Sequence, residues 1–289
     1  MRKLLAGIEA GGTKFVLGTA EAPGRPTKRH VLATQDPERT VGEATEWFAA
    51  QGEISAIGIA SFGPVAVDRA DPQWGHILRT PKPGWQGYDL AGHFARKFGV
   101  PVGLDTDVNA AALGEWRFGA GKAAGSLAYV TVGTGVGGGF VAEGRTLGGA
   151  GHPEMGHIHV KRRAGDDDWP GLCPYHGDCV EGLASGPAIL KRWGGTLSEL
   201  PVMHEAHRLV ADYLGQFAYA IQAMTGAEAL VMGGGVMKTP GLLDTVQARA
   251  EEIAHDYLPG GARQRIRAPA LEDDAGIAGA LCLAQDALG

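Results

Sequence analysis

Two of the three cysteines of this 289-residue chain lie close together in a segment that also holds histidines. Cys173 and Cys179 are six residues apart, His176 lies midway between them, and His157 lies upstream. Thiolates and imidazoles at this spacing are typical of a tetrahedral zinc site. The predicted ligands are therefore His157, Cys173, His176 and Cys179. Because all four ligands come from the protein, the predicted site is structural rather than catalytic.

Two glutamates flank these predicted ligands. Glu154 stands three residues before His157, and Glu181 lies two residues beyond the last cysteine of the set. A metal that fixes the loop would also orient both carboxylates, whose oxygens accept hydrogen bonds from hydroxyl groups. We therefore expect Glu154 and Glu181 to bind a substrate that carries hydroxyl groups. His152 and His159 could each replace His157 as the zinc ligand, although neither has the same relation to Glu154.

Three glycine-rich turns follow apolar segments, at Gly11-Gly12-Thr13-Lys14, at 133–139 and at 233–235. Such turns leave backbone N–H groups unshielded and can hold phosphate oxygens. One turn alone is more simply a tight hairpin, whereas two in corresponding positions of two α/β halves predict a phosphate clamp. The third would let a flat ring or a ribose approach the backbone. The predicted nucleotide-binding residues are Gly11, Gly12, Thr13, Lys14, Thr131, Gly133, Thr134, Gly135, Gly233, Gly234 and Gly235.

Asp107 lies where a predicted strand ends and a predicted helix, 108–118, begins. One interpretation is a helix N-cap, a position for which Asp105 and Thr106 compete. The other is a general base that accepts a proton from an attacking hydroxyl group. Asn109 could orient the substrate or strengthen the cap. These residues alone leave both interpretations open.

The tract Thr80-Pro81-Lys82-Pro83-Gly84-Trp85 is rigid and ends in an aromatic side chain. It could be a structured loop that packs against the core. It could equally offer the aromatic face that a saccharide ring favours.

The segments that carry these residues alternate between strand and helix patterns. The expected strands are 4–9, 15–20, 30–34, 54–61, 100–104, 127–132, 140–143, 229–232 and 266–269. The expected helices are 40–50, 88–98, 108–118, 188–193, 202–224, 242–257 and 277–288. We expect an α/β protein with an N-terminal domain, 1–118, and a C-terminal domain, 119–289. The predicted zinc loop spans about 149–182, and the final helix, 276–289, is expected to pack back on the first domain.

Composition and charge exclude several classes of protein. The content of 44% hydrophobic and 20% charged residues is ordinary for a globular protein. A net charge of −6 and a pI near 5.9 argue against a nucleic-acid binder. No apolar run approaches the roughly 20 residues that cross a bilayer. With two of three cysteines assigned to a metal, we expect a reducing, cytoplasmic location.

Taken together, the order and spacing of these motifs resemble the ROK family of sugar kinases and repressors. The resemblance runs through nearly the whole chain, from the first glycine hairpin through 107–111, the second hairpin and the zinc loop to 233–235. It implies the two-domain, actin-like ATPase (ribonuclease H-like) fold, with ATP and Mg²⁺ in the cleft. It also implies a structural Zn²⁺, a hexose that enters from the hinge side, and a homodimer.

Carried over residue by residue, the resemblance makes Asp107 the catalytic base for the sugar hydroxyl group. It makes Glu154, His157 and Glu181 contacts for sugar hydroxyl groups, with His157 also a zinc ligand. Gly63, Pro64 and Asn109 are further candidates for substrate contacts.

The chain departs from the family pattern at three positions. Glu9 stands where an Asp usually precedes the first hairpin, Thr106 where a sugar-binding asparagine is usual, and His176 where the middle of three cysteines is usual. The departures at Glu9 and His176, with the tract 80–85, look similar to the fructokinase branch. That branch implies transfer of a phosphoryl group from ATP to the 6-hydroxyl group of D-fructose.

Other functions fit the same fold. The sugar could be glucose, mannose or an N-acetylated hexosamine. A repressor would carry an additional N-terminal helix-turn-helix, and this sequence is expected to begin with the first strand of the ATPase fold. A non-catalytic sugar sensor is disfavoured because Asp107, Lys14 and both glycine hairpins are present.

Overall fold

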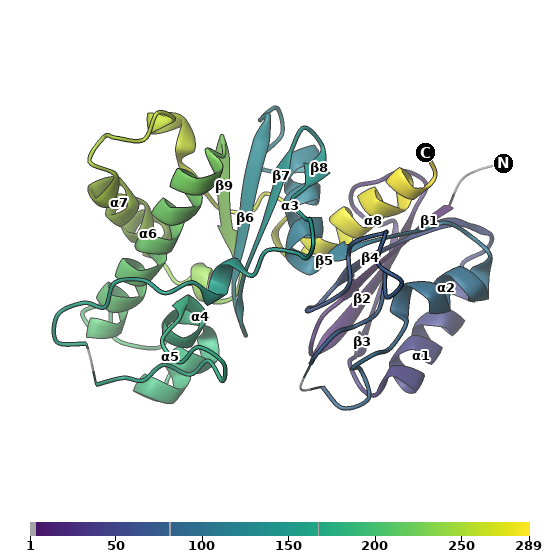
Figure 1. The fold of residues 1–289 in the computed structure, drawn as a ribbon, viewed down its shortest axis with the longest axis horizontal. Helices are drawn as coiled ribbons and strands as arrows, with labels where there is room; N and C mark the ends of the chain where they lie inside the picture. Colours follow the sequence, from purple (N-terminus) through teal and green to yellow (C-terminus); the bar gives the residue numbers. More distant parts are fainter. Residues whose placement is uncertain (1–3, 81, 167) are drawn as a thin grey trace. The chain divides into compact units, whose positions relative to one another are not determined.

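The structure is a computed structural model that describes residues 4–80, 82–166 and 168–289, and it divides into two compact units (Figure 1). Unit 1 comprises the chain up to Lys122, Gly139–Pro153 and Leu271–Gly289. Unit 2 comprises Ala123–Gly138 and Glu154–Ala270. The division into domains 1–118 and 119–289 stays a prediction.

Unit 1 is built on a five-stranded sheet with the order β3-β2-β1-β4-β5. Its strands are β1 (Leu4–Ala10), β2 (Lys14–Ala20), β3 (Lys28–Ala33), β4 (Ile54–Ser61) and β5 (Val102–Thr106). The first three pair antiparallel, as consecutive hairpins do, whereas β1, β4 and β5 run parallel. The carboxyl ends of these three parallel strands therefore lie at one edge of the sheet.

Helices cover both faces of this sheet. α1 (Pro37–Ala49) and α2 (Leu90–Phe98) pack on the face that includes Ile8, whereas α8 (Ala275–Ala287) packs on the face that includes Leu5. Side chains alternate between faces along a strand, so β1 contributes apolar side chains to both layers. The fourth helix, α3 (Asp107–Phe118), lies against α8.

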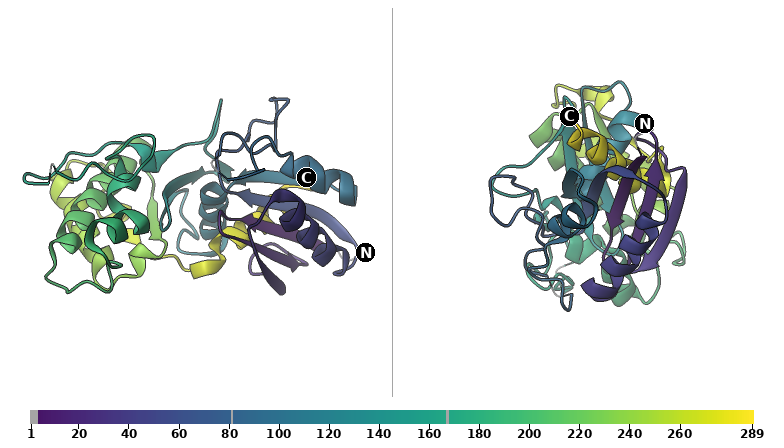
Figure 2. Two further views of the ribbon diagram at one scale, coloured as in Figure 1. Left: turned by 90° about the horizontal axis from the view of Figure 1, so that it is seen from below. Right: turned by 90° about the vertical axis from the view of Figure 1, so that its right-hand side faces the viewer.

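Glycines let α8 come unusually close to its neighbours. A Cβ atom added to Gly58 of β4 would lie 1.7 Å from the carbonyl oxygen of Ala280. One added to Gly279 would lie 1.8 Å from the carbonyl oxygen of Ala110 in α3. Some of the 47 glycines of the chain therefore serve backbone-to-backbone packing rather than turns. α8, drawn in yellow, runs along the sheet of unit 1 (Figure 1, Figure 2).

The second sheet has the order β10-β9-β6-β7-β8. Its strands are β6 (Ser126–Val132), β7 (Val136–Ala142), β8 (Arg145–Thr146), β9 (Ala229–Gly233) and β10 (Ile266–Arg267). β6, β9 and β10 run parallel, and β7 and β8 form an antiparallel hairpin. The boundary between the two units falls within β7, after Gly138.

The helices of unit 2 are α4 (Val180–Ala184), α5 (Gly186–Trp193), α6 (Glu205–Thr225) and α7 (Leu242–Ala254). α6 packs against α7 and α4. Short 3₁₀ turns occupy Met155–His157, Val236–Lys238 and Gly261–Gln264, and a further one, Glu272–Asp274, precedes α8 in unit 1. In the described parts of the chain, no helix is both long and apolar enough to span a bilayer.

The α/β class expected from the sequence is confirmed, and the differences concern element ends and short elements. α1 begins at Pro37 rather than at residue 40, because Asp36 caps the helix and proline suits its first turn. The strand expected at 266–269 is only Ile266–Arg267. α4 and the two-residue strand β8 were not expected from the sequence, because they are too short to show a hydrophobic period.

Candidate functional site

The parallel register of unit 1 brings three segments to one edge of the sheet. Ala10 pairs with Ser61, and Ser61 pairs with Thr106. The next residues along the chain are the first glycine hairpin, the Phe62-Gly63-Pro64 segment and Asp107, respectively. Phe62 N donates to the carbonyl oxygen of Ala10 (2.8 Å), and the Gly63–Pro64 peptide bond is cis.

The first hairpin is a tight turn held from both sides. Gly11 N donates to Lys14 O (2.9 Å), and a Cβ atom at Gly11 would lie 2.8 Å from that same oxygen. Thr34 Oγ1 donates to Gly11 O (2.7 Å), and Thr34 N donates to Thr13 O (3.0 Å). Glycine is therefore required at position 11 by space, and the hydrogen bonds from Thr34 hold the turn from its other side.

A second lysine, Lys82, also contacts this turn, although the sequence did not predict a contact between it and the hairpin. Lys82 Nζ donates a hydrogen bond to the carbonyl oxygen of Gly12. Lys82 comes from the tract 80–85, in which Pro81 lies outside the described residues. Trp85 at the end of that tract is 1% exposed and donates to Gln35 O (2.8 Å). The aromatic ring thus packs in the core, and the chemistry of the tract lies in its lysine.

Asp107 is the first residue of α3, and Thr106 is the N-cap. Thr106 Oγ1 accepts from Asn109 N (3.2 Å), whereas Asp107 Oδ1 accepts from Val108 N (2.9 Å). The capping role considered for Asp107 is therefore filled by its neighbour. A half-buried carboxylate remains at the carboxyl edge of the sheet, close to the helix N-terminus.

The side chain of Asn109 is buried and makes its hydrogen bonds within the protein. Its side chain is 2% exposed, and its amide makes hydrogen bonds to Asp105, Leu147 and Phe140. The predicted contact between Asn109 and substrate stays a prediction.

Glu9 carries a second carboxylate toward the same edge. Its Oε2 atom is buried without a hydrogen-bond partner among the described residues. A Cβ atom added to Gly276, in the first turn of α8, would lie 2.6 Å from the carboxyl carbon of Glu9. Burial raises the pKa of Glu9 to about 7, and the negative charge of Asp107 adds to this effect. Two carboxylates so placed favour a cation between or beside them.

The four predicted zinc ligands gather in unit 2. The donor atoms of His157, Cys173, His176 and Cys179 all lie within 4.8 Å of one another. His157 Nδ1 is 3.6 Å from each of the two sulfur atoms, and His176 Nδ1 is 3.7 Å from Cys173 Sγ. Two thiols and two imidazoles converging in this way fit the ligand set of a tetrahedral zinc site.

The two glutamates beside this cluster have different surroundings. Glu154 Oε2 lies 3.8 Å from His157 Nε2, the ring nitrogen that faces away from the sulfurs. Glu181 Oε2 accepts from Val136 N (3.0 Å), in the second glycine hairpin. A carboxylate on the outer nitrogen of a metal-bound histidine fixes the orientation of the ring. Glu154 can therefore orient His157, while Glu181 connects the loop to the hairpin.

The alternative histidines lie elsewhere. His152 belongs to unit 1, where Nε2 accepts from Val65 N (3.3 Å). His159 Nε2 lies 3.4 Å from Asp178 Oδ1 and 3.2 Å from His176 O. Neither is part of the ligand cluster.

The second and third glycine turns lie together in unit 2, but the turn predicted at 133–139 is shorter than expected, because β7 already begins at Val136. Thr131 pairs with Gly233, and a Cβ atom at Gly234 would lie 2.4 Å from the carbonyl oxygen of Val132, next to Gly133. Gly234 has a φ of 94°, so both its conformation and its surroundings require glycine. The two turns thus form one glycine-lined end of the sheet, a surface that a nucleotide can approach closely.

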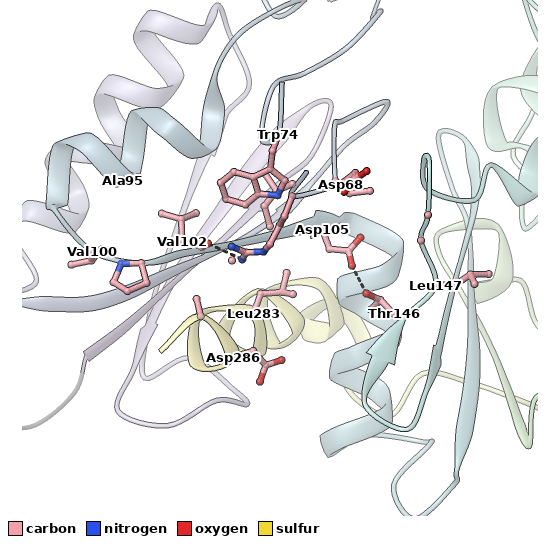
Figure 3. A pocket seen from close by; sticks show the side chains of 18 residues that line it. Asp68, Trp74, Ala95, Val100, Val102, Asp105, Thr146, Leu147, Leu283 and Asp286 are labelled. Carbon is pink, nitrogen blue, oxygen red and sulfur yellow. Dashed lines mark hydrogen bonds between the residues drawn. The ribbon is translucent and has the colours of Figure 1, made fainter. Parts of the chain in front are cut away.

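A cavity of about 900 Å³ opens in unit 1, beside the edge strand β5 (Figure 3). Its wall includes Trp74, Arg69, Asp105 and Thr146, and none of the predicted site residues. Arg69 Nη2 donates to Val102 O (3.2 Å) and lies over the Trp74 ring.

The raised pKa of Glu9 predicts that the stability of the protein depends on pH. Folding raises this pKa from 4.5 to about 7, so ionisation of Glu9 destabilises the folded protein increasingly as the pH rises through that interval. We expect Glu9→Gln to raise the free energy of unfolding by at most about 3 kcal/mol at pH 8, and by less than about 1 kcal/mol at pH 5. Urea unfolding at both pH values measures this. Glu53→Gln, at an exposed position, is the control, and an equal effect of Glu9→Gln at both pH values would contradict the assignment.

Comparison with known proteins agrees with this geometry. The profile of the ROK family matches residues 5–287. The fructokinase of Zymomonas mobilis is 44% identical, and the alignment covers 98% of this chain and 97% of the relative.

Two solved structures resemble the fold over nearly the full length of each chain. One is a ROK hexokinase from Thermus thermophilus (TM-score 0.79, 28% identity, 98% of both chains covered). The other is a ROK family glucokinase from Streptomyces griseus in complex with glucose and AMPPNP (TM-score 0.76, 26% identity, 98% of this chain and 99% of that chain covered). These similarities confirm the expected resemblance and the actin-like ATPase fold, and the chain belongs to the ROK family.

Proposed function

We propose that this protein is an ATP-dependent fructokinase that phosphorylates the 6-hydroxyl group of D-fructose. The observation that carries the proposal is the placement of Asp107. It follows a parallel strand at the same sheet edge as the first glycine hairpin, with the capping role already filled by Thr106. The 44% identity to a fructokinase, against 26–28% to the hexokinase and glucokinase structures, favours fructose among the hexoses.

In the proposed reaction, Asp107 accepts the proton of the 6-hydroxyl group while that oxygen attacks the γ-phosphorus of ATP. The new O–P bond forms as the bond to the bridging oxygen breaks, and ADP leaves with the electron pair. The backbone N–H groups of the first hairpin, with Lys14 and Lys82, offset negative charge on the phosphate oxygens. Mg²⁺, when bound with ATP, would supply further charge compensation, and we propose that the Glu9 carboxylate would hold it.

The remaining predicted site residues are assigned either to ATP or to the hexose. The nucleotide is proposed to lie on the glycine turns, with Thr131, Gly133, Thr134, Gly135, Gly233, Gly234 and Gly235. The hexose is proposed to be held by Gly63, Pro64, Glu154, His157 and Glu181. A carboxylate accepts from a hydroxyl group with directional specificity, so Glu154 and Glu181 are the residues that would select among hexoses.

A structural Zn²⁺ fits the four donors of the cluster. When bound, it would tie residue 157 to residues 173–179 and so hold Glu154 and Glu181 in fixed positions. Glycines support this arrangement: a Cβ atom at Gly156 would lie 1.8 Å from Val136 O, and one at Gly182 would lie 1.8 Å from Gly177 O. The loop is therefore packed against the second hairpin as well as cross-linked. A homodimer and a cytoplasmic location, both expected from the sequence, stay predictions.

The proposed activity is tested by ADP release with Mg·ATP and a panel of fructose, glucose, mannose and N-acetylglucosamine. We expect kcat/KM for fructose to exceed that for each other sugar by at least about 10-fold, because carboxylates fixed for one set of hydroxyl groups reject another. Phosphorus NMR of the product should show a 6-phosphate. Turnover mainly on an aldose would contradict the substrate, and no turnover on any sugar would favour a sensor.

The metal proposal has a readout that does not depend on activity. We expect one zinc ion per purified chain, and loss of zinc in Cys173→Ser with a fall in Tm of about 5 °C or more. Elemental analysis and thermal unfolding measure both. Cys282→Ser is the control because Cys282 lies in α8, outside the cluster, and should leave the zinc content unchanged. A chain that contains no zinc, or a Cys173→Ser variant that retains it, would contradict the proposal.

A further inference from the structure

The side-chain amide of Asn109 is inserted between two strands. β7 and β8 pair through Val141 with Thr146 and through Ala142 with Arg145. The next pair along the hairpin is Phe140 with Leu147, where an antiparallel ladder normally has two reciprocal backbone hydrogen bonds. Leu147 N does donate to Phe140 O (2.8 Å).

The second bond of that pair is made through Asn109. Phe140 N donates to Asn109 Oδ1 (3.2 Å), and Asn109 Nδ2 donates to Leu147 O (3.0 Å). The amide thus takes the place of a peptide group in the ladder. The regular pairing of β7 with β8 ends here. The segment that follows Leu147 in the sequence leads to Glu154.

Asp105 determines which way this amide points. Asp105 Oδ1 accepts from Asn109 Nδ2 (2.9 Å) and from Thr106 N (2.7 Å), and Asp105 Oδ2 accepts from Thr146 Oγ1 (2.6 Å). Figure 3 shows the Asp105–Thr146 bond on the cavity wall. Asp105 Oδ1 is an acceptor, because it already receives a hydrogen bond from Thr106 N, and Leu147 O also needs a donor. Nδ2 must therefore face these two groups, which turns Oδ1 toward Phe140 N.

The backbone of β7 also meets the first turn of α3 directly. A Cβ atom added to Gly139 would lie 2.4 Å from Val108 O and 2.7 Å from Asn109 N. Glycine at this position therefore lets the strand approach the helix closely enough for the Asn109 amide to reach both strands. Asp107 lies two residues before Asn109 in that same turn.

We infer that Asn109, oriented by Asp105, is a positioning residue that locks the first turn of α3, and with it Asp107, onto the β7–β8 hairpin. This inference rests on the proposed role of Asp107 as the general base. It differs from a direct contact between Asn109 and sugar, because the amide is buried and its polar atoms are used within the protein. The expected consequence of its loss is a lower kcat rather than a higher KM for the hexose.

The test uses two isosteric substitutions. Asn109→Asp keeps the acceptor for Phe140 N, but a carboxyl group carries at most one proton, so it cannot donate to both Asp105 and Leu147 O. Asp105→Asn remains satisfiable, because an amide oxygen can accept from Thr106 N and Asn109 while its NH₂ group donates to the Thr146 hydroxyl oxygen.

We expect Asn109→Asp to lower kcat by about 100-fold with the KM for fructose changed less than about 3-fold, since misplacement by about 1 Å has effects of this size. Asp105→Asn should lower kcat less than about 5-fold, because the network stays satisfied. Gln216→Glu is the matched control. The Gln216 amide likewise accepts from a backbone N–H group, Lys161 N, and donates to Lys161 O and to Asp212, but it lies in α6 of unit 2 and should have a small effect on kcat.

Two results would overturn the inference. One is Asn109→Asp with kcat close to that of the wild type, which would show that the amide does not position Asp107. The other is a raised KM for fructose with kcat unchanged, which would return Asn109 to direct sugar contact. If the wild type phosphorylates no sugar, the proposed function fails, and the same variants are then compared by their free energies of unfolding. A larger loss for Asn109→Asp than for Asp105→Asn supports the network, and equal losses contradict it.

Discussion

The parallel register of β1, β4 and β5 is the constraint on which the chemistry of unit 1 depends. It places the residues that follow Ala10, Ser61 and Thr106 along one edge of the sheet. A glycine turn predicted to bind phosphate, a cis Gly–Pro segment and a carboxylate thus become neighbours although they are far apart in sequence. A slip of one residue would move every side chain of a strand to the opposite face, so packing on both faces of the sheet fixes this register.

Close backbone contact at glycine maintains that arrangement. α8 fits against β4 at Gly58 and against α3 at Gly279, and β7 fits against α3 at Gly139. In unit 2, Gly156 and Gly182 hold the cysteine–histidine loop against its neighbours in the same way. Any side chain at these positions would separate elements that carry candidate site residues. The glycines therefore contribute to the site without touching a ligand.

Much of the candidate site could be predicted because its chemistry is local in sequence. The two cysteines and their histidines lie within a segment of 23 residues, 157–179, and the structure brings their donor atoms within 4.8 Å of one another. Asp107 was recognisable as a polar residue at a strand–helix junction, although only the structure shows that Thr106 fills the capping position.

The remaining features depend on contacts between distant segments. Lys82 meets Gly12 across 70 residues of sequence, and Asn109 is inserted beside Phe140 and Leu147 only because of the hairpin register there. No single-segment pattern contains that information. The short elements β8 and α4 could not be predicted for a different reason. They have two and five residues, too few to show a hydrophobic period.

The role proposed for Asp107 is that of the base in phosphoryl transfer, beyond any part that it plays in holding the helix. Asp107→Asn tests it most directly, because the amide oxygen can still accept from Val108 N while the basic carboxylate is lost. The measurement is kcat with Mg·ATP and fructose, together with ATP affinity by equilibrium dialysis. We predict a fall in kcat of at least about 1000-fold with ATP affinity within about 3-fold of wild type. A variant that turns over at nearly the wild-type rate, or that loses ATP binding to the same extent as activity, would contradict the role of Asp107 as the base.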